Sequence, residues 1–392
     1  MKPNIYSFYP KLFCAVVFIL LFTISGFVSE MAPEKLSLSF EESFTIGENS
    51  DADTKYFLVS PYQIRTDNRQ NLYIAEGQQK TIMAFGPQGK YLRSIGRSGN
   101  GPGEFPSGPI FNLNNKNEIV ALDMESQRVT WFSKKGDILS EYAPSQAGTV
   151  WSEKFFQTAD GNYIMLKKPR NIGEDDPSNY RKYVFHRYSK SFENRINSFG
   201  AFDQLVSKGD AKFVDMISNS MNSGNFIKTG EDSFWYVPGI YDGKVYEFEK
   251  SADEWKLVNT FDGQTNWEEA VVVDTDEKGS MSIVTYGDEG QQRSRGKINS
   301  YSIGIVQAND GKVLHFSGQR MQDQDSLQTM VEVFDPEGSL IGTGSFDEIA
   351  INNHLLNFES HHPAIWMDEK DRFYFIDHND MPVVRVGKIE GL

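Results

Sequence analysis

Four of the six histidines, His354, His361, His362 and His378, lie within 25 residues of one another near the C-terminus. Imidazole binds divalent metals and exchanges protons near neutral pH. His361 and His362, with the pair formed by Asp377 and His378, are therefore the first candidates for a metal or acid–base site. The alternative is two polar loops whose side chains hydrogen-bond to backbone. We favour this alternative, because no H-E-x-x-H motif or spaced third ligand accompanies these residues.

Other catalytic signatures are missing from the sequence. The only cysteine, Cys14, lies in an apolar N-terminal stretch, so a chain that has lost this stretch has no thiol for a disulfide, a zinc site or a nucleophile. The glycine-rich segment 96–103 lacks the Gly-Lys-Ser/Thr ending of a phosphate-binding loop, and we interpret it as a structural turn. No G-x-S-x-G motif occurs. We name no catalytic residue and expect no cofactor, with a divalent metal at the histidines left open.

The composition narrows the class of protein and of partner. The 392 residues are 39% hydrophobic and 13% aromatic, with 33 glycines and 15 prolines, which is typical of a turn-rich β protein. The formal net charge is −15, whereas nucleic-acid binding needs a basic face. We therefore expect no nucleic-acid partner.

The N-terminus resembles an export signal. Lys2 and Lys11 precede an apolar run without charge at residues 12–28, in the order of a secretory signal peptide. The run is also just long enough to remain as a membrane anchor. We expect residues 1–30 to be a signal peptide or an anchor, and residues 31–392 to form an exported domain in the periplasm or at the cell surface.

A recurring unit organises the rest of the chain. Polar turn residues with Asp, Asn or Gly are followed by three mostly apolar residues, in six copies. The apolar triplets begin at Leu72, Ile119, Tyr163, Phe234, Val313 and Phe373. The first two spacings, 47 and 44 residues, match the length of a four-stranded propeller blade.

A second marker completes each unit. In five copies an aromatic residue and a tight polar turn follow the triplet, so each unit contains two hairpins and four antiparallel strands. The sixth copy, at residues 361–389, lacks one strand, whereas the candidate strand 36–46 precedes the first copy. We therefore predict an all-β, six-bladed propeller closed by this N-terminal strand in the last blade. A seventh blade from residues 266–305 is the alternative.

The segment 95–105, IGRSGNGPGEF, resembles the inter-blade segment of NHL-repeat propellers. The chain as a whole is similar to exported bacterial six-bladed propellers of the NHL/TolB-like type. Glu76 stands where that family usually has Asp. The resemblance implies that the loops between the second and third strands of each blade share one face with the inter-blade segments.

That face is where we expect a ligand funnel, because loops from several blades converge there. The candidate ligand-binding residues are His361, His362, Asp377, His378, Glu76, Asp123, Tyr241 and Asp242. The acidic members would favour a cationic ligand or a metal.

These observations favour a monomeric module that binds a protein, peptide or carbohydrate, with membrane contact only through an uncleaved N-terminal segment. The alternative is a metal-dependent propeller enzyme, a lyase or a lactone hydrolase, with its site at the channel mouth. The polar insertions Asn171–Arg181 and Tyr286–Lys297 are expected to be loops that contact the partner.

Overall fold

The computed structural model describes residues 32–47, 56–143, 154–167, 183–201, 204–205, 224–265, 271–274, 281–287, 290–320, 327–349, 364–378 and 381–392. The chain divides into a short unit, Met1–Glu34, and a large unit, Lys35–Leu392. The fold described below is that of the large unit.

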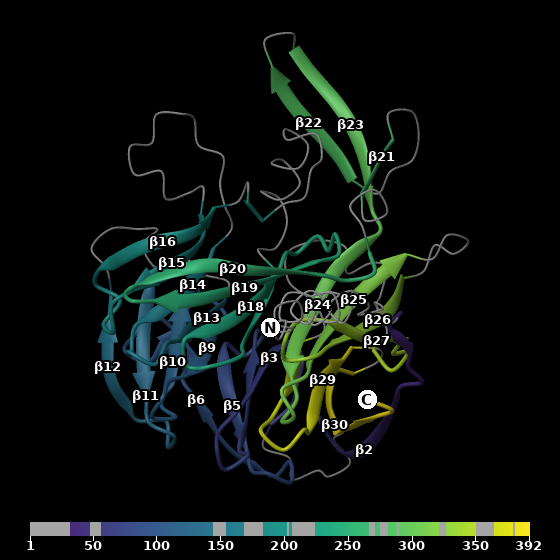
Figure 1. The fold of residues 1–392 in the computed structure, drawn as a ribbon. Helices are drawn as coiled ribbons and strands as arrows, with labels where there is room; N and C mark the ends of the chain where they lie inside the picture. The colour runs from purple at the N-terminus through teal and green to yellow at the C-terminus, as the bar shows by residue number, and fades with distance from the viewer. Residues whose placement is uncertain are drawn as a thin grey trace, which may run out of the picture. The chain divides into compact units, whose positions relative to one another are not determined.

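Six antiparallel sheets form the blades of a β-propeller (Figure 1). In chain order, the strands of a blade are named a to d. The first three blades are β3 (Pro61–Thr66), β4 (Leu72–Glu76), β5 (Thr81–Phe85) and β6 (Tyr91–Ile95); β9 (Ile110–Leu113), β10 (Ile119–Asp123), β11 (Arg128–Phe132) and β12 (Ile138–Tyr142); and β13 (Lys154–Gln157), β14 (Tyr163–Leu166), β15 (Tyr183–Tyr188) and β16 (Arg195–Ala201).

The other three blades repeat this order, and the last one borrows a strand from the N-terminus. They are β17 (Asn225–Lys228), β18 (Ser233–Val237), β19 (Lys244–Ser251) and β20 (Glu254–Asp262); β24 (Ser300–Gln307), β25 (Val313–Arg320), β26 (Leu327–Phe334) and β27 (Leu340–Ser345); and β28 (Ile365–Met367), β29 (Phe373–Asp377), β30 (Val383–Glu390) and β2 (Ser39–Ile46). The two-residue strand β1 (Glu34–Lys35) adjoins β27.

The turn signature places the b strands. Every one of the six predicted apolar triplets falls in a b strand, where the side chains are buried. In the first blade an acidic side chain holds the preceding turn, because Asp67 accepts hydrogen bonds from the backbone of Arg69 and Asn71, both at 2.9 Å. Such side-chain to backbone bonds stabilise the tight reversal between strands a and b.

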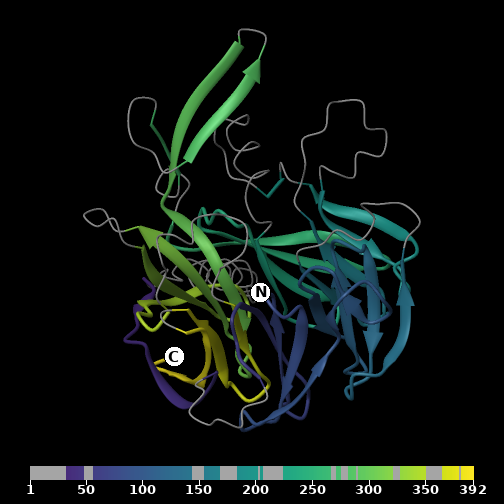
Figure 2. The ribbon, with the colours of Figure 1, turned by 180° about the vertical axis from the view of Figure 1, so that it is seen from behind.

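The N-terminal strand closes the ring, as predicted. Strand β2 pairs antiparallel with β30, with Phe40 opposite Ile389 and Ile46 opposite Val384. The two strands lie side by side in both views, purple beside yellow (Figures 1 and 2). The sheet edge that the last blade would otherwise expose is therefore paired.

Apolar side chains pack between neighbouring blades all the way round the ring. Between the first and second blades, for example, Tyr73 and Ile82 pack with Phe111 and Phe132. Between the last and first blades, Val386 and Tyr374 share a cluster with Ile74. Each blade is thus stabilised mainly by its two neighbours.

Residues 266–305 do not form a seventh blade. The strands β21 (Val271–Asp274), β23 (Gly290–Ile298) and β22 (Met281–Gly287) form a separate three-stranded sheet, and β24 already belongs to the fifth blade. The prediction of a loop at Tyr286–Lys297 was wrong, because most of this segment lies in β23, which pairs with β22 from Gly290 to Gly296. The other predicted loop, Asn171–Arg181, lies outside the described residues.

The described residues contain no helix long and apolar enough to cross a membrane. The predicted signal or anchor, residues 12–28, lies outside them.

Candidate functional site

The propeller has two faces with different connections. The a–b and c–d turns lie on one, here called the turn face, and the b–c loops and inter-blade segments lie on the other, here called the loop face. The predicted ligand residues belong to the loop face.

Glu76 ends strand β4 on the loop face and is fully buried. Its Oε1 accepts a hydrogen bond from the backbone N–H of Ser60 at 2.5 Å, and its Oε2 accepts one from Gln79 at 2.5 Å. Ser60 leads into the first strand of the blade, and Gln79 belongs to the b–c turn. The carboxylate therefore links the entry to the first strand and the b–c turn through hydrogen bonds.

Asp123 does the same in the second blade. Its Oδ2 accepts from the N–H and hydroxyl of Ser107 at 2.9 and 2.8 Å, and its Oδ1 accepts from the N–H of Ser126 at 2.7 Å. Glu76 and Asp123 thus occupy corresponding positions despite their different lengths. Both carboxylates are directed at backbone groups, and their contact with a ligand stays a prediction.

The glycine-rich segment is a clamped structural turn, as expected. Arg128 Nη2 donates to the carbonyl of Asn100 at 3.1 Å, and Lys80 Nζ donates to the carbonyl of Pro106. Gly96 has a φ of 68°, and a Cβ there would lie 2.2 Å from the ring of Phe105. Only glycine fits this position.

Tyr241 and Asp242 lie in the b–c loop of the fourth blade, and both are buried. The Tyr241 hydroxyl donates to Glu332 Oε2 in β26. Burial, followed by the charge of Glu332, raises the pKa of Tyr241 well above its usual value. Asp242 Oδ1 accepts from the N–H of Lys244 at 3.2 Å.

A chain of hydrogen bonds continues from Glu332 across three blades. His315 Nδ1 lies 3.1 Å from Glu332 Oε2, and His315 Nε2 lies 3.1 Å from the Ser302 hydroxyl. Asn225 Nδ2 donates to this hydroxyl at 2.9 Å, and Lys154 Nζ donates to Asn225 Oδ1. With the Nδ1–H tautomer of His315, every bond runs in one direction, from the Lys154 cation to the Glu332 carboxylate.

Ser302, His315 and Glu332 have the connectivity of a hydrolase triad. Their residues are only 2%, 0% and 2% exposed. A nucleophile needs space for a carbonyl group beside its hydroxyl, whereas Asn225 and the imidazole already occupy the hydrogen-bonding positions around Ser302. We interpret the cluster as a polar joint between blades. Sequence reasoning missed it, since its members are separated by up to 178 residues, from Lys154 to Glu332.

The histidine candidates are only partly described. Asp377 ends β29 and His378 follows it; both are half-buried, and each interacts with another group. His361 and His362 lie outside the described residues. In the part of the chain that the structure describes, no group of three or more His, Cys, Asp or Glu side chains could hold a metal ion. The histidine site stays a prediction.

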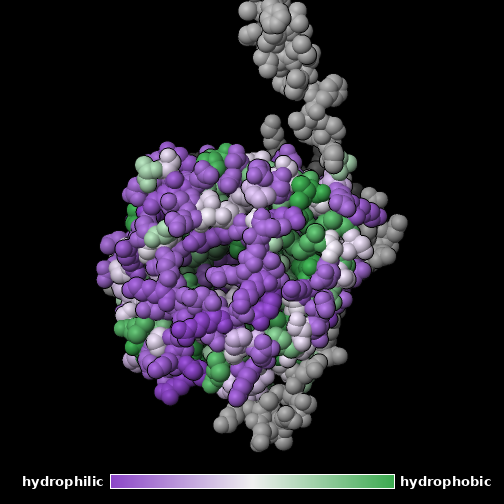
Figure 3. Space-filling view, turned by 60° about the horizontal axis from the view of Figure 1, so that its bottom comes forward, coloured by the Kyte–Doolittle hydropathy of each residue, from purple (hydrophilic) through white to green (hydrophobic). Residues whose placement is uncertain are grey.

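The turn face has a hollow at its centre (Figure 3), and the rim is hydrophilic. The a strands surround this central channel. Strand β3 contacts β9 and β28, β9 contacts β13, and β24 contacts β17 and β28. Lys154 in β13 reaches Asn225 in β17 and completes the ring.

The a strands differ in charge from the rest of the protein. These six strands, all described, read PYQIRT, IFNL, KFFQ, NFIK, SYSIGIVQ and IWM. They contain three basic residues, Arg65, Lys154 and Lys228, and no acidic residue, although the whole chain has a net charge of −15. The wall of the channel is therefore cationic in an acidic protein.

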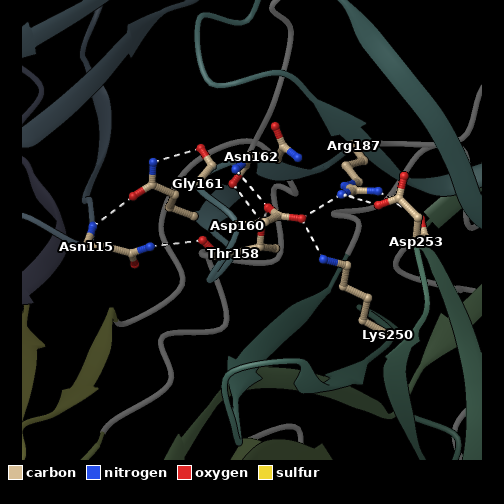
Figure 4. Close-up of polar contacts among 9 residues, drawn as sticks. Asn115, Thr158, Asp160, Gly161, Asn162, Arg187, Lys250 and Asp253 are labelled. Atoms are coloured by element: carbon tan, nitrogen blue, oxygen red, sulfur yellow. Dashed lines mark hydrogen bonds and ion pairs between the residues drawn. The ribbon is translucent and has the colours of Figure 1, made fainter.

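Away from the channel, the turn face carries a paired charge cluster (Figure 4). Asp160 Oδ2 lies 2.6 Å from Arg187 Nη2 and 2.7 Å from Lys250 Nζ, and Arg187 also pairs with Asp253 at 2.9 Å. Hydrogen bonds from Lys250 and its neighbours hold the pKa of Asp160 below its usual value despite burial. Because these charges satisfy one another, the cluster joins the third and fourth blades.

Comparison with known proteins bears out the architecture. A model of the family DUF5128, described as a 6-bladed beta-propeller, matches residues 53–302. No curated protein matches the chain.

Several solved structures share the fold. A member of the duf4221 family from Bacteroides vulgatus is 11% identical, with a TM-score of 0.55, over 92% of this chain and 100% of that chain. A Bacteroides fragilis protein described as a "Putative exported protein" is 12% identical, with a TM-score of 0.53, over 92% and 99%. Virginiamycin B lyase from Staphylococcus aureus is 11% identical, with a TM-score of 0.44, over 90% and 99%. At these identities the likeness to the two Bacteroides proteins shows the fold alone.

Proposed function

The chain belongs to the DUF5128 family of six-bladed β-propellers, and from this membership and the channel we propose that it is an exported binding module. Its partner is a protein, a peptide or a carbohydrate, part of which enters the central channel from the turn face. The NHL/TolB-like resemblance of segment 95–105 is consistent with such a module.

One observation carries the proposal: the charge of the channel wall is opposite in sign to that of the whole protein. Of the three cations, Lys154 is used in the polar joint between blades, and the apolar clusters supply the packing between blades. Arg65 and Lys228 therefore carry the argument for a ligand. Basic side chains at a central hollow are suited to attracting and orienting a ligand.

Export is supported by the N-terminal segment. Lys2 and Lys11 before the apolar run 12–28 have the order of a signal peptide, and the B. fragilis protein of similar fold carries an exported description. We place the module in the periplasm or at the cell surface.

The test begins with the purified full chain on arrays of glycans and peptides. We expect saturable binding to one class of ligand. Hydrogen exchange of the complex then locates the site, and protection is expected in the a strands and the a–b turns. Absence of any saturable ligand would contradict the proposal, as would protection confined to the d strands β6, β12, β16 and β20.

Metal analysis of the same sample addresses the enzyme alternative. A stoichiometric divalent metal, whose removal abolishes turnover of a lactone or another cleavable substrate, would replace the binding proposal with a metal-dependent propeller enzyme. Folded protein that binds its ligand equally well after treatment with a chelator supports the binding module.

A further inference from the structure

Arg65, in the channel wall, pairs with no carboxylate among the described residues. Its Nη1 donates to the carbonyl of Ile64 at 2.6 Å, which is the adjacent residue. Its Nε is buried and donates to no described group, and neither Nε nor Nη2 takes part in an ion pair. Burial lowers the pKa of Arg65 to about 10.

Trp366 holds this guanidinium in place. The Arg65 guanidinium carbon lies 4.6 Å from the centre of the Trp366 ring, as in a cation–π contact. Trp366 is itself fixed, because its Nε1 donates to the hydroxyl of Thr66 at 2.8 Å. Stacking occupies one face of the guanidinium. At its edge, Nη1 already donates to Ile64 and Nε is buried, so Nη2 is the N–H group left to meet a ligand among the described residues.

Lys228 provides a second positive charge at the same end of the channel. It ends strand β17, as Thr66 ends β3, and both strands lead into a–b turns on the turn face. The fourth blade is opposite the first in a ring of six. Lys228 Nζ donates a long bond, 3.3 Å, to the carbonyl of Gln157. Burial lowers its pKa, and the charges of Glu231 and Asp232 in the adjoining a–b turn act in the opposite direction.

We propose that the turn-face mouth of the channel is a carboxylate-binding site, in which Arg65, held against Trp366, binds the carboxylate of the ligand and Lys228 adds a second cation. This inference rests on the proposed binding function and specifies its ligand. A buried cation without an anion is costly, and a planar guanidinium edge matches a carboxylate geometrically. The site favours an anionic ligand, in contrast to the cationic ligand that the loop-face acids suggested.

Two sources of carboxylate suit the proposed partners, an acidic sugar and an acidic peptide. The test titrates the full chain with D-glucuronate, with D-glucose as its neutral counterpart, and with N-acetyl-glutamate, using calorimetry. We expect at least one of the two acids to bind and glucose not to bind. Which acid binds more tightly identifies the source. Glucose binding as tightly as glucuronate would overturn the proposal, and so would failure of both acids to bind.

Variants assign the binding to Arg65. Arg65→Gln should weaken acid binding by roughly tenfold to a hundredfold, the effect of losing one charge-assisted hydrogen-bonded contact, and Arg65→Lys should rescue only part of it. The matched control, Lys135→Gln with Lys388→Gln, removes two exposed cations outside the channel and should leave binding unchanged. Unchanged affinity in Arg65→Gln would overturn the assignment. If that variant does not fold, Lys228→Gln must weaken acid binding, and unchanged affinity there overturns the proposal.

The outcomes separate this inference from the proposed function. The ligand could bind saturably and protect the a strands, yet bind Arg65→Gln as tightly as the wild type. That result would support the binding module and contradict the carboxylate site. If no ligand on the arrays binds, both the proposed function and the carboxylate site are contradicted.

Discussion

Tyr241, in the b–c loop of the fourth blade, donates its phenolic hydrogen to Glu332 in strand β26 of the fifth blade. The same carboxylate accepts the backbone N–H of Gln264 at 2.6 Å, and it lies 3.1 Å from His315 Nδ1. One buried side chain therefore holds a loop, an inter-blade segment and a sheet together.

Replacing Glu332 should show how much this joint contributes to stability. Glu332→Ala leaves three donors without an acceptor in the interior, and we expect the free energy of unfolding to fall by about 3 kcal/mol or more. Urea denaturation measures the change. The control is Glu254→Ala, since that side chain is 67% exposed beside Lys256, and its effect should stay within about 0.5 kcal/mol. Equal effects of the two substitutions would show that the joint is not a stabilising feature.

His186 should make the protein sensitive to mild acid. It is buried in β15, and burial, with smaller contributions from Lys167 and Arg195, lowers its pKa from 6.5 to about 3. The unfolded chain therefore binds a proton between pH 6.5 and about 3 that the folded chain does not, so the free energy of unfolding falls as the pH falls through this window.

The His186 contribution is about 1.4 kcal/mol per pH unit below 6.5. His186→Gln keeps a polar partner for the Ser198 hydroxyl, which lies 2.8 Å from Nδ1, and removes the titration. Between about pH 7 and about pH 5, the wild type should lose about 2 kcal/mol more than the variant in urea denaturation. An identical loss in both proteins would show that His186 is readily protonated in the folded state.

Phe40 tests closure of the ring by β2. Its ring lies 5.2 Å from that of Phe375 and 6.5 Å from that of Phe346, and the Arg385 guanidinium lies 5.2 Å from its centre. Phe40→Ala should cost about 2 kcal/mol, less than truncation in a fully buried core because the ring is partly exposed.

The control for Phe40 is Phe57→Ala, whose side chain is 53% exposed and should matter little. Removing residues 31–46 altogether should lower the melting temperature further, because a whole strand is lost from the last blade. A truncated protein that melts like the intact one would contradict closure by β2.

The fold could be predicted because its determinants are local. Turn residues such as Asp67 and the apolar triplets that follow them recur with the period of a blade, and a strand left over at residues 36–46 matched a strand missing near the C-terminus. Segment 286–297 was predicted wrongly because its Gly, Gln and Arg side chains are typical of loops, whereas its pairing with β22 depends on backbone hydrogen bonds.

The site could be predicted far less well. Glu76 and Asp123 have the residue types of ligand contacts, and only the folded chain shows that they are directed at Ser60 and Ser107. The contact between Arg65 and Trp366 joins the first and last blades. This contact depends on the packing of the closed ring, so no local sequence pattern predicts it. The signal that was available is the absence of acidic residues from all six a strands.

The most direct measurement of the central claim is a crystal structure of the full chain with the tightest ligand found on the arrays. The account predicts that the ligand lies in the channel mouth on the turn face, with an anionic group within hydrogen-bond distance of Arg65 and close to Trp366. A ligand bound on the outer d strands or among the b–c loops, with no anion at the Arg65 guanidinium, would contradict it.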